Sequence, residues 1–291
     1  MSTEMLLDLR GLHQEMNTPF CGGTIRCWIS AHVGGSTTCV CAISDFGDVA
    51  GWSENAAVGR DHAFLLIPED SNNDGEPDTW NRDDNNDGLN DLMVDLGQLP
   101  GGPASLAHDL NDQLEVVGMS EDVNFQSRPV VWDELSPLAL GSLNSTGFGY
   151  AHAISESGQI GGNTPDSQGN PHIVVWKPNV EGGYDLNDLG TIKNKSQLIC
   201  QGISNPDAQQ NIIVVGYSSE SKPVKRNFVT TFSPFVWATE AEMLTDLNSL
   251  VTSDDGFTKL LLASGVNDSG IIVGKGEFEN SEQAFVAVPN P

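Results

Sequence analysis

Short apolar segments alternate with polar turns along almost the whole chain, and they recur in a cycle of four. The first segment of each cycle runs into a turn rich in Asn, Asp and Ser, residues whose side chains favour tight turns. A second apolar segment returns at once and carries a glycine. The first segments are Cys41–Asp45, His108–Asp112, His152–Glu156, Gln201–Asn205 and Ser264–Asp268, and the glycines are Gly51, Gly118, Gly162, Gly216 and Gly274.

The third segment of each cycle is rich in Phe, Val and Trp, and the fourth reads Asp-Leu-Gly-x-Leu or a near relative. All four are short and bounded by turn residues, so each predicts a strand. The third segments are His62–Leu65, Arg128–Trp132, His172–Trp176, Ser233–Trp237 and Gln283–Val286. The fourth are Asp8–Leu12, Asp95–Leu99, Ala139–Leu143, Asp188–Ile192 and Asp246–Leu250.

The repeated cycle predicts an all-β protein: a five-bladed β-propeller of four-stranded antiparallel blades, forming one domain over residues 1–291. One such sheet cannot bury both of its apolar faces, whereas five sheets around an axis cover one another. The last cycle has only three segments, between Leu262 and Val288. We expect the N-terminal segment Met5–Gly11 to complete that blade and so to close the ring without an edge strand.

Net charge narrows the choice of partners. The chain has 40 acidic and 13 basic residues, a formal charge of −27. This argues against nucleic acid and anionic membranes, which bind proteins through Lys and Arg. No apolar run approaches the roughly 18 residues of a spanning helix, so we expect no membrane insertion. We expect a monomer, and no secretory signal within the first residues, which lack a basic region and a long apolar run.

Three motifs together resemble a known repeat. They are Ala-x-Ala-Ile-Ser-x-x-Gly at Ala151–Gly158, the tripeptide His62-Ala63-Phe64, and the Asp-Leu-Gly segments. This combination resembles the bacterial HAF-repeat family over nearly the whole chain, although the complete His-Ala-Phe tripeptide occurs once. The resemblance implies a propeller that is extracellular or on the cell surface, and it implies no reaction.

An insertion at residues 68–94, within the first blade, has the spacing of a calcium site. Two loops, Asp70–Asp78 and Asp83–Asp91, place oxygen-bearing side chains at positions 1, 3, 5 and 9 and glycine at position 6, as an EF-hand loop begins. Neither has Glu at position 12, and the tandem spacing resembles thrombospondin type 3 repeats, where acids of one loop complete the next site. The expected Ca²⁺ ligands are Asp70, Asn72, Asp74, Glu76, Asp78, Asp83, Asp84, Asn85, Asp87, Leu89, Asp91 and Asp95.

The alternative for this insertion is an acidic loop without order. Two other insertions, Gln14–Ser36 and Ser219–Thr231, are expected on the opposite face of the propeller, because they connect blades and second to third strands. Long loops on a rigid scaffold are frequent binding sites, although ordinary tolerated insertions are the alternative. The candidate ligand-binding residues there are Trp28, His32, Lys222, Lys225 and Arg226.

A ring of residues near the axis is the remaining candidate. Equivalent positions before the turn of each first strand hold Cys41, His108, His152, Gln201 and Ser264. His108 and His152 are candidate ligand-binding residues, for a transition metal or another ligand, unless they only pack between blades. Asp109 replaces the Ala or Gly of its equivalents and is the candidate catalytic carboxylate.

These features predict a secreted or cell-surface, Ca²⁺-stabilised module that binds a glycan or a surface protein. The alternatives are a glycoside hydrolase or polysaccharide lyase with an acidic axial pocket around Asp109, and a structural domain of a larger surface protein. The pairing of the odd number of cysteines stays open between local disulfides and free thiols: Cys21, Cys27, Cys39, Cys41 and Cys200.

Overall fold

The computed structural model describes residues 19–20, 23–24, 34–55, 59–133, 135–224, 227–252 and 256–290. Outside these lie the expected closing strand Met5–Gly11, most of the insertion Gln14–Ser36, and Cys21, Cys27, Trp28, His32, Lys225 and Arg226. Within them, a short hairpin of β1 (Pro19–Phe20) and β2 (Gly23–Thr24) and a 3-10 turn η1 (Leu247–Ser249) accompany five larger sheets. The prediction of an all-β protein is confirmed.

Each larger sheet is antiparallel and its strands are neighbours in chain order. Sheet 1 contains β3 (Gly34–Ile43), β4 (Val49–Asn55), β5 (Arg60–Leu66) and β6 (Met93–Asp95); sheet 2 contains β7 (Ser105–Leu110), β8 (Val116–Glu121), β9 (Ser127–Asp133) and β10 (Ser136–Ala139). Sheet 3 contains β11 (Tyr150–Ile154), β12 (Ile160–Pro165), β13 (Pro171–Pro178) and β14 (Tyr184–Gly190). Sheet 4 contains β15 (Gln197–Ile203), β16 (Ile213–Val224), β17 (Asn227–Ala238) and β18 (Thr245–Asp246); sheet 5 contains β19 (Phe257–Val266), β20 (Ile272–Phe278) and β21 (Ser281–Ala287).

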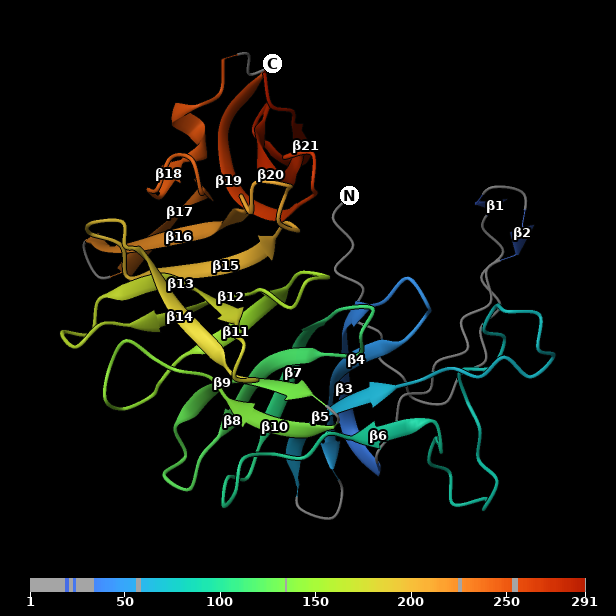
Figure 1. The fold of residues 1–291 in the computed structure, drawn as a ribbon. Coiled ribbons are helices and arrows are strands. Elements are labelled where there is room, and N and C mark those ends of the chain that lie inside the picture. The colour runs from blue at the N-terminus through green and yellow to red at the C-terminus, as the bar shows by residue number, and fades with distance from the viewer. Residues whose placement is uncertain are drawn as a thin grey trace.

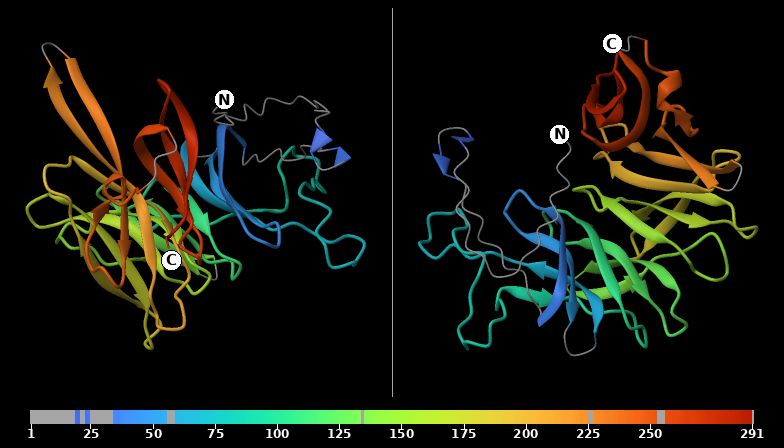
Figure 2. Two further views of the ribbon diagram at one scale, coloured as in Figure 1. Left: turned by 90° about the horizontal axis from the view of Figure 1, so that it is seen from above. Right: turned by 180° about the vertical axis from the view of Figure 1, so that it is seen from behind.

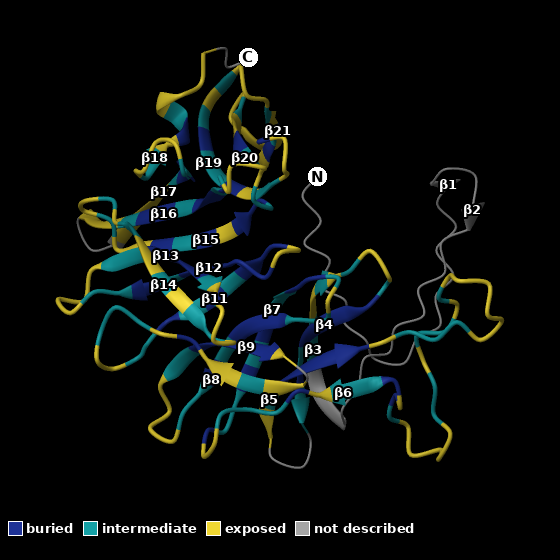
Figure 3. Ribbon diagram, viewed as in Figure 1, coloured by how far each residue is buried: buried dark blue, intermediate teal, exposed yellow. Residues whose placement is uncertain are grey.

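The core lies between successive sheets rather than in one central mass (Figure 3). A separate cluster of buried apolar side chains fills each of the four junctions from sheet 1 to sheet 5. The tryptophans that end the third strands belong to these clusters, and each packs against the preceding sheet: Trp132, Trp176 and Trp237. Stacking therefore buries faces that no sheet could cover alone.

The five sheets follow one another around an arc (Figure 1). Among the described residues, sheet 5 does not pack on sheet 1 as successive sheets pack on each other. Sheet 5 has three strands in this part of the chain, and the segment expected to complete it lies outside. The structure thus establishes five antiparallel sheets stacked in chain order.

Every first strand has a β-bulge at the same place. The register shifts between Val40 and Ala42 in sheet 1 and between Ala107 and Asp109 in sheet 2, and sheets 3 to 5 repeat the shift. A bulge turns one extra side chain away from the ladder. The extra residues are the five that the sequence placed in a ring: Cys41, His108, His152, Gln201 and Ser264.

The bulge also explains the glycine of each second strand. Just before the bulge, the first strand brings a carbonyl oxygen so close that a Cβ on the facing residue would overlap it. Only glycine leaves room for this approach. The five pairs are Gly51 with Cys39, Gly118 with Leu106, Gly162 with Tyr150, Gly216 with Ile199 and Gly274 with Leu262.

The fourth strands differ from their predicted bounds. In sheet 1 the strand ends at Asp95, where the predicted segment begins, because Asp95 accepts a hydrogen bond from Gly97 N (2.8 Å) and turns the chain. In sheet 4 the expected strand Asp246–Leu250 is mostly the 3-10 turn η1. There Asp246 accepts from Asn248 N and caps the turn, which ends the ladder early.

Candidate functional site

The insertion at residues 68–94 contains two loops with the same internal hydrogen bonds. In the first, the carboxylate of Asp70 accepts from Asp74 N (3.2 Å) and Gly75 N (2.8 Å), and Asn72 Oδ1 accepts from Asp74 N (2.9 Å). Glycine at the sixth position adopts φ +95°, a conformation that other residues rarely take. The spacing of oxygen-bearing side chains thus folds the loop around its own first carboxylate.

The second loop repeats this arrangement thirteen residues later. Asp83 accepts from Asp87 N (3.1 Å) and Gly88 N (3.0 Å), and Asn85 Oδ1 accepts from Asp87 N (2.9 Å). The positive-φ positions also match: Asn73 and Gly75 in the first loop, Asn86 and Gly88 in the second. The alternative of an acidic loop without order does not fit this duplicate geometry.

The ninth residue of each loop closes it by the same contact. Asp78 accepts from Ser71 N (3.1 Å) and Asp91 accepts from Asp84 N (2.7 Å). The hydroxyl of Ser71 also donates to Asp78, and these hydrogen bonds hold the pKa of the Asp78 carboxyl below its usual range. Asp78 is therefore ionised over the physiological pH range.

The oxygen-only donor set suits a hard cation, but the carboxylates do not yet converge. In the described residues, no group of three or more His, Cys, Asp and Glu side chains is close enough to hold a metal ion. Asp84 and Asp95, two of the acids expected to complete these sites, have other partners: Asp84 pairs with Arg82 (3.1 Å) and Asp95 bonds His62 (2.9 Å). A Ca²⁺ ion would require the carboxylates of each loop to converge, and each could keep its backbone N–H bond, because a carboxylate has about four lone-pair sites.

The insertion is fastened to the body of sheet 1. Trp80 Nε1 donates to the carbonyl of Gly47 (3.0 Å), in the turn between β3 and β4. Asn90, only 5% exposed, donates to the carbonyl of Trp80 (2.8 Å) and accepts from Leu92 N (3.1 Å). The loops are thus held at the end of β5 by contacts that do not depend on an ion.

A repeated His–Asp pair links third and fourth strands. His62 Nδ1 lies 2.9 Å from Asp95 Oδ2 in sheet 1, and His172 Nδ1 lies 2.8 Å from Asp188 Oδ1 in sheet 3. The first residue of the His-Ala-Phe motif therefore bonds the first residue of Asp-Leu-Gly. Repetition at equivalent places indicates a structural role for these histidines, although His62 Nε2 is buried without a partner.

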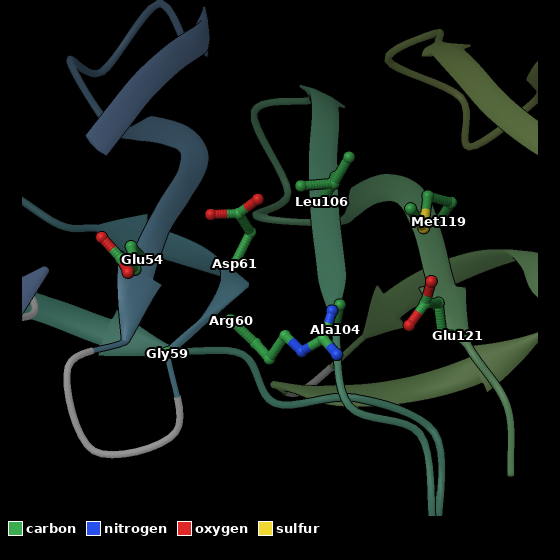
Figure 4. Close-up of a pocket in the computed structure, with 8 residues that line it drawn as sticks. All are labelled: Glu54, Gly59, Arg60, Asp61, Ala104, Leu106, Met119 and Glu121. Atoms are coloured by element: carbon green, nitrogen blue, oxygen red, sulfur yellow. The ribbon is translucent and has the colours of Figure 1, made fainter. Parts of the chain in front are cut away.

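A cleft of about 460 Å³ opens between sheets 1 and 2 (Figure 4). Sheet 1 supplies Arg60 and Asp61 from the start of β5, and sheet 2 supplies Glu121 from the end of β8. The remaining lining residues are Glu54, Gly59, Ala104, Leu106 and Met119. Since they flank the connections between second and third strands, the cleft lies on the face predicted to bind.

The charged groups of this cleft are largely without protein partners. Neither the guanidinium of Arg60 nor the carboxylate of Asp61 makes an ion pair or hydrogen bond to another described residue. Glu121 Oε2 is buried and also has no hydrogen-bond partner. A buried carboxylate oxygen without a donor is costly, so this atom marks a place where a ligand or water is needed. Sequence reasoning missed all three residues.

The axial candidates are engaged in packing between sheets. The rings of His108 and His152 stack with centroids 5.0 Å apart and planes 13° apart, so their in-plane nitrogen lone pairs run parallel and do not converge on one metal. His108 Nδ1 lies 2.7 Å from the carbonyl of Ala151, and His152 Nε2 lies 2.8 Å from Asn163 Oδ1. Burial lowers the pKa of His108, and it lowers the pKa of His152 to about 3.

Asp109 ties sheet 2 to sheet 3. One carboxylate oxygen accepts from Leu110 N (3.0 Å) and the other from Ile154 N (2.9 Å) in β11. Burial raises the pKa of Asp109 to about 6, against the opposing effect of these hydrogen bonds. With both oxygens occupied by backbone donors, Asp109 is arranged as an inter-sheet contact.

Of the basic candidates, only Lys222 lies in the described residues, and it pairs with Glu220 (2.9 Å). The three described cysteines are free thiols: Cys39, Cys41 and Cys200. Cys39 and Cys41 approach to 3.8 Å between sulfurs, whereas Cys200 is buried in the junction of sheets 3 and 4.

No known protein family and no curated protein sequence matches this chain, so neither comparison supports the resemblance to the HAF-repeat family. In the described part of the chain, no helix is long and apolar enough to cross a membrane. Function must therefore be inferred from the geometry of the site.

Proposed function

We propose that the chain is a calcium-stabilised, closed five-bladed propeller that binds a glycan outside the cell. The observation that carries the binding proposal is the cleft between sheets 1 and 2. There the side chains of Arg60 and Asp61 and the Oε2 atom of Glu121 have no partner among the described residues. Its volume is within the range of small-ligand sites. Calcium and closure of the ring would hold its two walls in place.

Exposed apolar side chains support closure of the ring. Val286 of sheet 5 is 66% exposed, and Ile43 of sheet 1 is 67% exposed. Their equivalents in the other sheets face a neighbouring sheet and are buried or half-buried. For Val286 these are Leu65, Val131, Val175 and the half-buried Val236; for Ile43 they are Leu110, Ile154, Ile203 and the half-buried Val266. Packing sheet 5 on sheet 1 would bury both residues as the other junctions do.

A repeated hydrogen bond between turns supports the same closure. The turn acid of one sheet accepts a backbone N–H from the equivalent residue of the preceding sheet: Asp112 from Asp45 (2.9 Å), Glu156 from Asp112 (2.9 Å) and Asp268 from Asn205 (2.8 Å). By this rule Asp268 N would donate to the carboxylate of Asp45. Asp268 and Asp45 occupy the equivalent turn positions of sheets 5 and 1, so this hydrogen bond would form at the junction between those two sheets.

Substitution of Val286 by Thr tests the closed ring. Thr keeps the β-branched shape, so at an exposed site the free energy of unfolding should change by less than about 0.5 kcal/mol. Buried against sheet 1, its hydroxyl would cost about 1–2 kcal/mol. Val123→Thr, at a 65% exposed turn residue, is the matched control. Equal urea midpoints for the two variants would refute closure.

The chemistry of the cleft favours a sugar. Hydroxyl groups both donate and accept hydrogen bonds, so a sugar can satisfy the acceptors Asp61 and Glu121 together with the donor Arg60. Leu106 and Met119 add apolar surface against which the C–H groups of a ring can pack. A ligand with only acceptors would leave the carboxylates unpaired, and one with only donors would leave Arg60 unpaired.

Binding is tested by titrating neutral and acidic oligosaccharides into the full chain with Ca²⁺ present and measuring heat. Arg60→Ala and Glu121→Gln should each weaken binding at least tenfold, because a lost hydrogen bond to a charged group costs about 1.5–3 kcal/mol. Glu181→Gln, in the exposed turn between β13 and β14, should bind as wild type. Unchanged affinity in both cleft variants would place the ligand elsewhere.

Hydrolysis of the bound glycan is the second candidate function. Glu54, Asp61 and Glu121 line one cleft, and a pair of carboxylates is what most glycosidases use. Asp109, the earlier candidate, has both oxygens held by backbone N–H groups. Release of reducing ends that Glu121→Gln abolishes, even at ligand concentrations that saturate its weakened binding, would identify an enzyme; binding by wild type without release would identify a binding module.

A further inference from the structure

Sheet 4 carries a hairpin that projects beyond its neighbours. Strands β16 and β17 stay paired as far as Val224 and Asn227, whereas β15 stops pairing with β16 at Ser219. On the other side, β18 pairs with β17 only at Phe235 and Val236. We define the arm as residues 220–224 and 227–233; it stands clear of the stacked sheets in the left view of Figure 2.

The arm exposes apolar side chains on both of its faces. Phe228 is 75% exposed and Phe232 is 39% exposed, and as residues i and i+4 of one strand they share a face. Val224 and Val229 are each 48% exposed. Isolated two-stranded hairpins are only marginally stable in water, so a covering partner would stabilise an arm of this composition.

The outer edge of β17 lacks the usual protection against pairing. Residues 227–233, Asn-Phe-Val-Thr-Thr-Phe-Ser, contain no charge and no proline, the features that commonly block edge strands. Among the described residues, no strand pairs with β17 along this edge before Phe235. Its N–H and C=O groups are therefore available to another strand.

We propose that this edge pairs antiparallel with the same edge of a second copy of the chain. Two molecules of charge −27 repel each other over most of their surfaces. This uncharged projecting edge is a place where they can approach without bringing like charges together. Beyond a Debye length of about 8 Å, physiological salt screens the repulsion between the bodies.

The alternation of side chains sets the register of this pairing. With Thr230 on the two-fold axis, Phe228 of one copy lies opposite Phe232 of the other. This gives two cross-strand aromatic pairs on one face of a four-stranded intermolecular sheet. A two-fold contact of this kind is self-limiting, because each copy uses its β17 edge, whereas the other open edge of the arm, along residues 220–224 of β16, is blocked by Glu220, Lys222 and Pro223. The chain is then a weak dimer rather than the expected monomer.

Light scattering on the full chain at rising concentration tests the dimer. The mass should rise from 31.1 kDa toward twice that value, and Phe228→Lys should weaken dimerisation at least tenfold, because two lysines would enter an apolar contact. Phe125→Lys, at a 66% exposed turn residue of sheet 2, is the matched control and should dimerise as wild type. A mass that stays at 31.1 kDa up to several hundred micromolar overturns the proposal.

A second measurement fixes the register. Thr230→Cys should be cross-linked as a dimer by a short bismaleimide, because the two-fold axis brings residue 230 of both copies together. Wild type, with the same five native cysteines, measures cross-linking through the other thiols. A Thr230→Cys variant that is cross-linked no faster than wild type, or a dimer that survives Phe228→Lys unchanged, refutes pairing through this edge.

Discussion

Replacement of Gly162 by alanine is the sharpest test of how the bulge shapes each sheet. Gly162 lies in β12, opposite the bulge of β11. A Cβ there would lie 2.6 Å from Cζ3 of Trp176, and closer still to the carbonyl oxygen of Tyr150. The carbonyl is fixed in the ladder and Trp176 is completely buried, so neither neighbour can move aside alone.

The cost follows from these two contacts. Overpacking a dense core by one methyl group costs about 1–3 kcal/mol, occasionally more, and the carbonyl contact forces the two strands apart as well. We expect about 3 kcal/mol of lost stability, which lowers the melting temperature of a chain of this size by roughly 5 °C. Trp176 lies at the contact, so its fluorescence should change in the folded variant.

The control is Gly183→Ala, in the turn between β13 and β14. Its added Cβ would meet nothing nearer than Asn179, at 3.7 Å, and its φ is not positive. Melting followed by circular dichroism should place this variant within about 1 °C of wild type, consistent with a neutral surface change. If Gly162→Ala melts as high as Gly183→Ala, the close approach of the carbonyl is not what requires glycine.

Three further results are expected. Calorimetry with Ca²⁺ should show two sites, with Asp70→Ala and Asp83→Ala each removing one, and EGTA should lower the melting temperature of wild type by more than that of either variant. Burial lowers the pKa of His152 to about 3 in the folded chain, against 6.5 in the unfolded chain. The contribution of neutral His152 to the free energy of unfolding should therefore be complete above pH 6.5 and fall as pH drops toward 3, by up to about 5 kcal/mol. In urea melts at several pH values, the free energy of unfolding of His152→Gln should depend less on pH than that of wild type. Asp112→Ala, which removes the acceptor of Asp45 N, should cost about 1 kcal/mol in the same assay.

The five antiparallel sheets could be predicted from the sequence because their strongest signal is repeated. Turn residues and second-strand glycines recur at fixed places, and each reports a local backbone requirement, such as the space that Gly51 leaves for the carbonyl of Cys39. Strand ends were less predictable. The segment beginning at Asp246 has the pattern of a fourth strand, but a side-chain cap diverts it into η1. Competition between a side-chain cap and a β-ladder does not change the pattern of apolar and polar residues, so the sequence pattern does not reveal it.

Part of the candidate site could be predicted from the sequence and part could not. The two acidic loops of the insertion are contiguous in sequence, so the spacing from Asp70 to Asp78 encodes the geometry of the first loop directly. The cleft is not contiguous: Arg60 and Glu121 are distant in sequence and meet through the packing of two sheets. The sequence singled out Asp109 as a catalytic candidate because its equivalents are Ala or Gly. In the structure, however, its carboxylate accepts a hydrogen bond from Ile154 N of the next sheet. A break in a repeat marks an unusual contact, and the contact can be structural.

Strand β5 connects the two parts of the proposed site. It begins at Arg60 and Asp61, which line the cleft, and it ends at Leu66, where the calcium insertion follows. Seven residues of strand span about 20 Å, so an ion in the loops cannot touch a ligand in the cleft. Ala63, Phe64 and their neighbours are fully buried between these ends, which makes the strand a stiff connection. Calcium would therefore act on binding by fixing one wall of the cleft, and the ligand contacts themselves would come from the chain alone.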